Sequence, residues 1–230
     1  MKNLAVITAR GGSKRIPRKN IKIFFNRPII AYAIEACMDS GVFKEVMVST
    51  DDPEIAEISR KYKAKVPFIR SVKTSNDTAS TYDVLEEVVL EYKKLGQEFD
   101  NVCSVYPCVP FLTGKILREA YNKFIKYKVD ALVPVVKFSY PIQLAFRVEN
   151  NILKYACPEF EKCRSQDLEP MYHDAGMFCF VKIRALLNEK TLICRNSTYF
   201  EIKETRVQDI DTVEDWEMLE LKYKILNKLK

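Results

Sequence analysis

The sequence predicts an α/β fold in which a mostly parallel sheet is flanked by helices. Through the first 137 residues, short apolar runs of strand length alternate with longer amphipathic segments, as they do when parallel strands are joined by helical crossovers. Of the 230 residues, 47% are hydrophobic, which is enough for a substantial core. We therefore expect a single domain over residues 1–230, with an insertion at about 138–204.

The first elements are a strand, a loop, a helix and a second strand. LAVIT at 4–8 is a continuous apolar, β-branched run and predicts a buried strand. The segment 27–41 has helical spacing and ends at Gly41, a residue suited to the position after a helix. EVMVST at 45–50 predicts the second strand, and the Asp-Pro-Glu start of 51–62 is typical of a helix N-terminus.

The alternation continues as far as residue 136. Apolar runs predict three further strands, at 66–69, 101–106 and 131–136. Amphipathic segments at 81–96 and 113–128 predict the helices that connect them. In open α/β sheets, ligands bind at the carboxyl ends of the strands, so we expect the functional site at that edge.

The pattern changes from about 138 to 204. The stretch KFSYPIQLAFRVENNILKYACPEF alternates in the manner of strands around an Asn-Asn turn, which predicts an excursion from the main sheet. Its apolar side chains exceed what the main sheet can cover, and a second subunit is expected to bury them. VQDID at 207–211 is then expected as a strand end, followed by a closing amphipathic helix over 212–230.

One loop gathers much positive charge. ARGGSKRIPRKN at 9–20 holds five cations, two adjacent glycines and no acid directly after the first strand. Gly11 and Gly12 allow backbone dihedrals that other residues avoid and let main-chain N–H groups approach a ligand. We expect this loop to hold a polyphosphate, the alternative being a solvated basic loop. It contains neither G-x-x-x-x-G-K-[ST] nor G-x-G-x-x-G.

Several polar residues have both a functional and a structural interpretation. Asp209 and Asp211 place two carboxylates on one face of an extended backbone, which suits Mg²⁺, but Asp211 is also suited to cap the closing helix. SNDTAST at 75–81 offers hydroxyls to a base or a ribose, or caps the next helix. Asp51 and Asp52 are interpreted as capping residues rather than catalysts.

Composition limits the compartment and the chemistry. The seven cysteines include no C-x-x-C pair, which predicts reduced thiols rather than a metal or redox site. A signal peptide and a membrane span are both absent from the sequence pattern, so we expect a cytoplasmic protein with no membrane partner. The only histidine, His173, is a poor zinc site by itself, and no G-x-S-x-G hydrolase motif is present.

Six segments together identify a family. They are ARGGSKRIPRKN, STDDPEIAE, SNDTAST, YPCVPFLTG, RSQDLEPMYHDAG and QDIDTVEDW. In sequence and in order they resemble the motifs of CMP-nonulosonate synthetases, the cytidylyltransferases that activate sialic acid and its relatives. The resemblance covers nearly the whole chain. It implies a Rossmann-like sheet, dependence on Mg²⁺, and a homodimer formed largely through the insertion.

The resemblance also implies a reaction. The 2-hydroxyl group of a nonulosonic acid attacks the α-phosphorus of CTP, and pyrophosphate leaves. Within the family, YPCVPFL and QDLEPMYHDAG are most similar to the members that act on pseudaminic acid. Legionaminic acid, sialic acid and Kdo remain alternative sugars.

Individual roles follow from the same resemblance. Arg10 and Lys19 are the expected catalytic residues, with Lys19 facing the α-phosphate. The expected nucleotide-binding residues are Arg10, Gly11, Gly12, Ser13, Lys14, Asn20, Arg70, Ala79 and Thr81. The expected sugar-binding residues are Arg164, Gln166, Tyr172, His173 and Asp174. The expected metal ligands are Asp209 and Asp211.

Two positions depart from the family pattern. Tyr106 begins YPCVP where the sialic acid enzymes have Q-P-T-S-P, and it cannot make an amide contact with the base. Met177 stands where glutamine is common in the enzymes for pseudaminic acid, and with Phe178 it predicts an apolar patch for the sugar.

A function of a different class is a basic protein that binds nucleic acid through the 9–20 loop. It would account for the net charge of +6. It leaves the aspartate pair without a role, and no RNA-recognition or helix-turn-helix pattern is visible, so we expect no nucleic-acid partner.

Overall fold

A computed structural model describes residues 1–229. A seven-stranded sheet forms its centre, made of β1 (Asn3–Thr8), β4 (Glu45–Ser49), β5 (Asn101–Val105), β6 (Ala131–Lys137), β9 (Tyr172–Asp174), β10 (Phe178–Lys182) and β11 (Ser197–Glu201). The strand order is β11-β6-β10-β5-β1-β4, and β9 pairs with β6. Strand β1 is parallel to both of its neighbours, whereas β10 is antiparallel to β5 and β6. The predicted α/β sheet is confirmed, but it is mixed rather than mostly parallel: β1–β4, β1–β5 and β6–β11 are parallel, whereas β5–β10, β6–β10 and β6–β9 are antiparallel.

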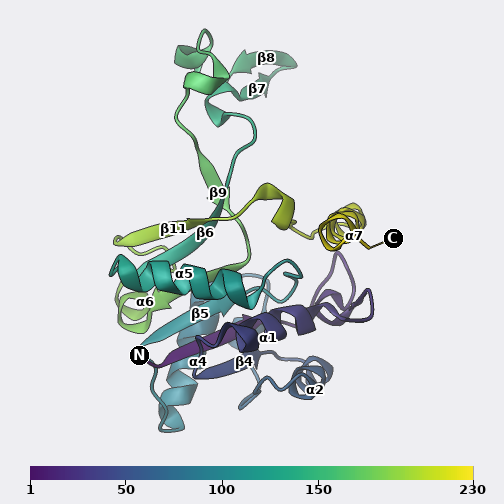
Figure 1. Cartoon of the computed structure of the whole chain (residues 1–230), viewed down its shortest axis with the longest axis vertical. Helices are drawn as coiled ribbons and strands as arrows, with labels where there is room; N and C mark the ends of the chain where they lie inside the picture. The colour runs from purple at the N-terminus through teal and green to yellow at the C-terminus, as the bar shows by residue number, and fades with distance from the viewer. Residues whose placement is uncertain (230) are drawn as a thin grey trace.

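Helices cover both faces of this sheet (Figure 1). They are α1 (Ile29–Ser40), α2 (Pro53–Lys61), α3 (Val72–Ser75), α4 (Thr81–Lys94), α5 (Gly114–Lys126), α6 (Ile183–Glu189) and α7 (Val213–Asn227). Alternate residues of β1 point to opposite faces, so that Leu4 and Val6 pack in the core under α4 and α6. Ala5 and Ile7 pack in the larger core under α1, α2, α5 and α7. Burial on both faces explains why β1 is apolar throughout.

Local signals set the ends of several helices. Gly41 follows α1 with φ of 65°, a left-handed conformation that glycine adopts without strain. Asp52 caps α2 by accepting hydrogen bonds from Glu54 N and Ile55 N. Ser80 begins α4 and Thr212 begins α7, each through a reciprocal capping box with the aspartate three residues later. The capping interpretation of Asp52 is therefore confirmed.

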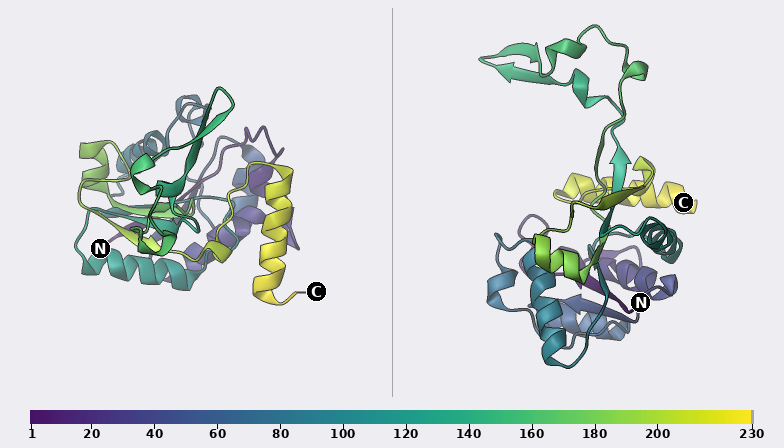
Figure 2. Two further views of the ribbon diagram at one scale, coloured as in Figure 1. Left: turned by 90° about the horizontal axis from the view of Figure 1, so that it is seen from above. Right: turned by 90° about the vertical axis from the view of Figure 1, so that its left-hand side faces the viewer.

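An arm leaves the sheet after β6. Residues 138–171 extend away from the body and carry the hairpin of β7 (Phe146–Glu149) and β8 (Ile152–Tyr155) at their far end (Figures 1 and 2). Asn150 and Asn151 form its two-residue turn with φ of 50° and 64°, as the tight turns of hairpins require. The Asn-Asn turn was predicted correctly.

Three predicted boundaries are wrong. The segment expected as an insertion at 138–204 divides in two, because β9, β10 and β11 return to the main sheet and only 138–171 form the arm. No strand forms at 66–69, since Pro67 has no N–H to continue a ladder and the pairing stops at one bridge, Met47 to Lys65.

The segment 207–211 pairs with no strand, so the predicted strand end is absent. Its polar contacts go forward into the cap of α7, where Asp211 N donates to Asp215 Oδ2 over 2.9 Å. The closing helix ends at Asn227, and Lys230, the last residue predicted for it, lies outside the described residues. Among residues 1–229, no helix has the length and apolar character needed to cross a membrane.

Candidate active site

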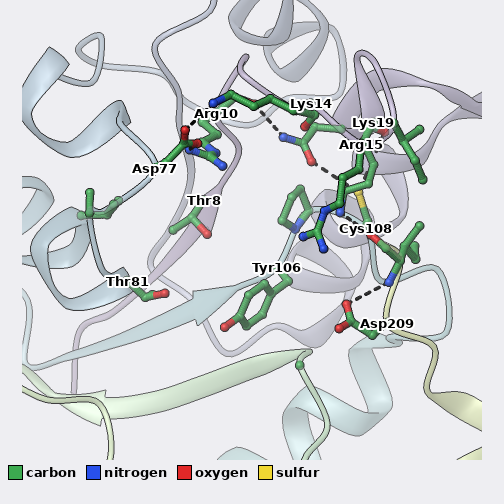
Figure 3. A pocket seen from close by; sticks show the side chains of 18 of the residues that line it. Thr8, Arg10, Lys14, Arg15, Lys19, Asp77, Thr81, Tyr106, Cys108 and Asp209 are labelled. Carbon is green, nitrogen blue, oxygen red and sulfur yellow. Dashed lines mark hydrogen bonds and ion pairs between the residues drawn. The ribbon is translucent and has the colours of Figure 1, made fainter. Parts of the chain in front are cut away.

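A cavity of about 560 Å³ opens at the carboxyl ends of β1 and β5 (Figure 3). The expected site residues that line it are Arg10, Ser13, Lys14, Lys19, Asn20, Arg70, Ala79, Thr81 and Asp209. They come from the loop after β1, the segment before α3, the start of α4 and the segment before α7. Its place at this edge of the sheet matches the position where open α/β sheets bind ligands.

Two acids that follow β4, Asp51 and Asp52, hold the loop after β1 in place. Gly11 N donates to Asp51 Oδ1 over 2.8 Å. A Cβ on Gly11 would lie only 2.7 Å from Asp52 Oδ2, so this glycine permits close approach to an acid rather than to a ligand. Arg18 forms an ion pair with Asp52 and holds the pKa of that carboxyl below its usual value.

The expected role of the two glycines is therefore modified. Neither Gly11 nor Gly12 lines the cavity, and neither has a left-handed φ. The loop's left-handed residue is Arg18, with φ of 56°, directly before the 3₁₀ turn η1 (Lys19–Ile21). Contacts to Asp51 and Asp52 hold the loop in its shape. Because these acids lie outside residues 9–20, the sequence of the loop alone does not indicate them.

Two cations of the 9–20 loop, Arg10 and Lys14, both pair with the carboxylate of Asp77. Asp77 accepts from Arg10 Nη1 over 2.7 Å and from Lys14 Nζ over 2.6 Å (Figure 3). The side chain of Asp77 is about half exposed, and both hydrogen bonds lower its pKa below the usual value, Lys14 contributing most. An anion that displaced Asp77 could bind both cations without moving them, because they already lie side by side.

Two further loop residues reach other parts of the cavity wall. Lys19 Nζ donates to the main-chain carbonyl of Ile210 over 2.5 Å. Asn20 is buried, and its Nδ2 donates to the carbonyl of Arg10 over 2.8 Å. Lys19 thus lies beside the segment that carries the expected metal ligands, and Asn20 holds the start of the loop.

The two expected metal ligands lie in different surroundings. Asp209 lines the cavity, whereas Asp211 forms an ion pair with Arg15 over 2.6 Å. Thr212, not Asp211, caps α7, so the alternative capping role of Asp211 is wrong. Within residues 1–229, no group of three or more acid, histidine or cysteine side chains could hold a metal. Two carboxylates suit Mg²⁺ when phosphate oxygens and water supply the remaining ligands.

Another part of the cavity lining combines a buried cation, Arg70, with the start of α4. Arg70 is buried and donates from Nε to Ser49 Oγ over 3.0 Å. Burial lowers the pKa of Arg70 to about 10, so it keeps its charge at neutral pH. Ala79 and Thr81 lie at the start of α4, whose first N–H groups favour polar or anionic partners. The SNDTAST segment caps α4 and also lines the cavity, so the capping interpretation is confirmed and the contact with a base or ribose stays a prediction.

A second cavity of about 310 Å³ adjoins the first. The two share Ser80, Thr81 and Tyr106 in their walls. The smaller one combines polar and apolar side chains; those used below are Ser104, Asp174, Phe178, Leu192 and Ile193. The hydroxyl of Ser104 is buried without a hydrogen-bond partner within the described chain. An unpaired buried hydroxyl at a cavity wall favours a ligand that can pair with it.

Tyr106 stands where the two cavities meet, between Thr81 and Asp209 in Figure 3. Its main-chain N–H donates to Met177 O over 2.9 Å, which ties the end of β5 to the start of β10. Burial, with a smaller contribution from the charge of Asp174, raises the pKa of the Tyr106 phenol. The hydroxyl therefore remains protonated at neutral pH and can donate to ligands on either side.

The expected sugar-binding residues do not form one cluster. Asp174 lines the smaller cavity and accepts from Gly176 N over 2.8 Å. Tyr172 and His173 lie exposed in β9 at the base of the arm. Arg164 and Gln166 lie exposed on the arm, where Arg164 Nε donates to Asp167 Oδ2 over 2.7 Å.

The expected apolar patch for the sugar is only partly present. Met177 is buried in the core and lines neither cavity, so its expected place is wrong, whereas Phe178 lines the smaller cavity. Leu192 and Ile193 complete this apolar wall. They follow the left-handed Lys190 and carry no motif, so sequence reasoning passed over them, as it did over Ser104.

Known proteins are similar to this chain in sequence. The family model described as cytidylyltransferase matches residues 4–151. The chain is 44% identical over 226 residues to the pseudaminic acid cytidylyltransferase of Campylobacter jejuni, covering 98% of this chain and 97% of that protein. It is 29% identical to the CMP-N,N'-diacetyllegionaminic acid synthase of Legionella pneumophila, covering 96% and 95%.

A solved structure shares the fold. CMP:2-keto-3-deoxy-manno-octonic acid synthetase in complex with CTP superposes with a TM-score of 0.71 at 18% identity, over 96% of this chain and 98% of the other. At this identity the likeness concerns the fold alone. It supports the same arrangement of sheet, flanking helices and loop after the first strand.

Proposed function

The chain is a member of the cytidylyltransferase family, and on that premise we propose that it transfers CMP from CTP to the 2-hydroxyl group of pseudaminic acid. The observation that carries the proposal is the pair of adjoining cavities that meet at Tyr106. One is lined by cations and the other by a mixed polar and apolar wall. The Campylobacter jejuni relative, which matches over nearly the whole chain, carries this activity in its name.

In the proposed complex the triphosphate of CTP occupies the larger cavity. Arg10 and Lys14 exchange the carboxylate of Asp77 for phosphate oxygens, since both cations already lie at the cavity wall. Ser13 and Asn20 contribute polar groups at the same end. The cytosine lies toward the start of α4, near Ala79, Thr81 and the buried Arg70.

The proposed reaction is one displacement at phosphorus. The sugar's 2-hydroxyl oxygen bonds to the α-phosphorus, the bond from that phosphorus to the bridging oxygen breaks, and pyrophosphate leaves as the hydroxyl proton is released. Alignment and charge neutralisation are the main requirements of such a transfer. Lys19, near the end of the 9–20 loop, contacts the 209–211 segment through Ile210. From there it supplies positive charge at the α-phosphate.

Asp209 and Asp211 would hold Mg²⁺ in the proposed enzyme. Their donor set fits, because Mg²⁺ in phosphate sites is bound by one or two carboxylates together with phosphate oxygens. The ion pair of Asp211 with Arg15 places positive charge at one of these carboxylates in the free chain. When bound, the metal supplies further positive charge beside the phosphates.

The sugar occupies the smaller cavity. Pseudaminic acid carries two acylamino groups and a methyl terminus, so its pocket needs both amide partners and an apolar surface. Ser104, Asp174 and Tyr106 supply the polar groups, and Leu192 and Ile193 supply the apolar wall. Because this cavity shares the wall at Tyr106 with the larger one, the sugar's 2-hydroxyl can face the α-phosphate.

We also propose a homodimer formed through the arm. The register of the hairpin places Phe146, Val148, Leu153 and Tyr155 on one face. Val148 is 67% exposed and Leu153 is 60% exposed, so this apolar face is uncovered in the single chain. A second copy of the chain would bury it.

The cytoplasm is the proposed compartment of the reaction. The seven cysteines are free thiols, and four of them are buried. Thiols stay reduced in the cytosol, where disulfides are rare.

The decisive experiment measures pyrophosphate release from CTP with a panel of nonulosonic acids. We expect turnover to be greatest with pseudaminic acid and to require Mg²⁺. Greater turnover with legionaminic or sialic acid would change the sugar and leave the chemistry in place. Absence of pyrophosphate release with every sugar would overturn the proposal.

A further inference from the structure

Cys108 lies in the wall of the larger cavity, in the loop that follows β5. Its Sγ lies 3.4 Å from Asn20 Oδ1 and 3.9 Å from the carbonyl oxygen of Lys19. Both contacts are to η1, which forms the end of the 9–20 loop, called the phosphate loop from here on. The thiol therefore connects two walls of the cavity that are separated by 88 positions in sequence.

The contact that the Asn20 side chain makes with Arg10 shows which group donates in the hydrogen bond between Cys108 and Asn20. Asn20 Nδ2 donates to the carbonyl of Arg10 over 2.8 Å. This contact requires the NH₂ group of Asn20 to face Arg10 and its oxygen to face Cys108. The thiol must then be the donor. Without it, the buried Asn20 oxygen would lose this partner.

The thiol remains a donor throughout the neutral pH range. Burial raises the pKa of Cys108 to about 12, although the charge of Lys19 opposes the shift. A thiolate would be an acceptor and would repel Asn20 Oδ1. Cys108 is therefore suited to hold an amide, whereas a reactive cysteine requires a lowered pKa.

We infer that Cys108 is a positioning residue for the nucleotide: its thiol orients the Asn20 amide, and that amide holds the main chain of the phosphate loop at Arg10. Arg10 lies near the start of the loop and Lys19 near its end. The hydrogen bond from Asn20, which follows Lys19, to the carbonyl of Arg10 links these two ends. A loss of the thiol hydrogen bond should therefore loosen both cations together. The inference rests on the proposed function, because it takes CTP as the ligand of this cavity.

Two substitutions separate the hydrogen bond from simple packing. Cys108→Ser and Cys108→Ala both remove the sulfur atom, but only serine keeps a donor. We expect Cys108→Ala to weaken CTP binding by roughly five- to tenfold, the effect of one buried acceptor left unpaired. Cys108→Ser should restore most of the affinity. Cys37→Ala is the matched control, since Cys37 is a buried cysteine of α1 outside the cavity.

The measurements are calorimetric titration with CTP alone, steady-state kinetics, and the melting temperature of each variant. Cys108→Ala should raise the KM for CTP, with a smaller effect on the KM for the sugar. Cys37→Ala should lower the melting temperature and leave CTP binding unchanged. Equal weakening by Cys108→Ser and Cys108→Ala would assign Cys108 to packing and overturn the inference, as would unchanged binding in both.

Hydrogen exchange of the free protein tests the positioning role without any substrate. Faster exchange of amides 10–20 in Cys108→Ala, but not in Cys108→Ser, is expected. If this difference appears while the wild-type protein fails to bind CTP, the proposed function fails and CTP is lost as the ligand, whereas the ordering of the 9–20 loop by Cys108 stands. If wild-type protein binds CTP and the loop exchanges equally in all variants, the positioning role fails and the proposed function stands.

Discussion

Lys19 Nζ donates a hydrogen bond to the carbonyl oxygen of Ile210, over 2.5 Å and across 191 positions of sequence. Ile210 lies between Asp209 and Asp211, so this contact brings the end of the phosphate loop to the two carboxylates. The proposed catalytic cation and the proposed metal ligands therefore occupy one side of the cavity. A phosphate group bound there would face both.

Lys19→Ala should slow the chemical step more than it weakens CTP binding. Arg10 and Lys14 still hold the triphosphate in the ground state, whereas the charge of Lys19 matters most as the α-phosphate reorganises. We expect kcat to fall by roughly a hundredfold or more. Single-turnover rates and CTP titrations separate the two effects. Lys22→Ala is the control, because Lys22 lies over the Trp216 ring outside the cavity. An effect confined to CTP affinity would limit Lys19 to binding.

Asp209→Ala and Asp211→Ala should each abolish Mg²⁺-dependent turnover while the protein stays folded. Each substitution removes one of the two proposed protein ligands, and we expect the remaining carboxylate to bind Mg²⁺ too weakly to support turnover. The measurement is pyrophosphate release across a Mg²⁺ titration, together with circular dichroism. Glu217→Ala, an exposed acid of α7, should retain full activity. Wild-type turnover in either aspartate variant would remove the metal assignment.

Asp77→Asn should bind CTP more tightly than the wild-type protein. Asp77 pairs with the same two cations that we assign to the triphosphate. Because both ion pairs are exposed, we expect only about a two- to fivefold lower Kd. The difference should shrink as salt is added.

The pH dependence of this effect follows from the direction of the Asp77 pKa shift. The pKa of Asp77 lies below its usual 3.8, so its ion pairs are complete above that value and are lost only as the pH falls through the lowered pKa. The effect of Asp77→Asn on CTP binding should therefore be constant from about pH 5 to 8. Weaker CTP binding by the variant would show that Asp77 supports the loop in the complex.

The arm should hold the protein as a dimer. Light scattering at micromolar concentration should give twice the chain mass of 26.7 kDa. Val148→Asp combined with Leu153→Asp should yield a monomer, because both substitutions place charge on the apolar face of the hairpin. Ile152→Asp is matched in exposure but lies on the other face, and it should remain dimeric. A monomeric wild-type protein would contradict the dimer.

Patterns local in sequence predicted the parts of the structure that local physics decides. The apolar run of β1, the Asn150–Asn151 turn and the cap at Asp52 are each recognisable from residues within a few positions of one another. The charge of the 9–20 loop likewise indicated a functional segment, and Arg10, Lys14, Arg15 and Lys19 line the cavity, whereas the binding of a polyphosphate there stays a prediction. For these features the sequence signal and the structural cause are the same.

Contacts between distant segments could not be predicted in this way. The return of β10 to a place between β5 and β6 is decided by pairing over long sequence separations, and its apolar run equally suits an insertion. The pairing of Asp77 with Arg10 spans 67 positions. Leu192 and Ile193 became candidates only when the fold placed them in the lining of the same cavity as Asp174.

The preference for pseudaminic acid should depend on the smaller cavity. Asp174→Asn removes the charge while its side-chain oxygen can still accept from Gly176 N. We expect a rise in the KM for the sugar of roughly tenfold, as when a charged hydrogen bond is lost, with CTP affinity unchanged.

Competition between sugars gives the sharper measurement of this preference. A pocket whose buried polar groups stay unpaired disfavours a wrong ligand strongly, whereas an apolar mismatch costs only about 1–3 kcal/mol. Ser104→Ala removes the buried hydroxyl that has no partner in the chain, so it should narrow the preference for pseudaminic over legionaminic and sialic acids. Val133→Ala is the control, since Val133 supplies only apolar surface to the same cavity. Equal selectivity in Ser104→Ala and the wild-type protein would remove this hydroxyl from sugar recognition, and better turnover of sialic acid by the wild-type protein would overturn the assigned sugar.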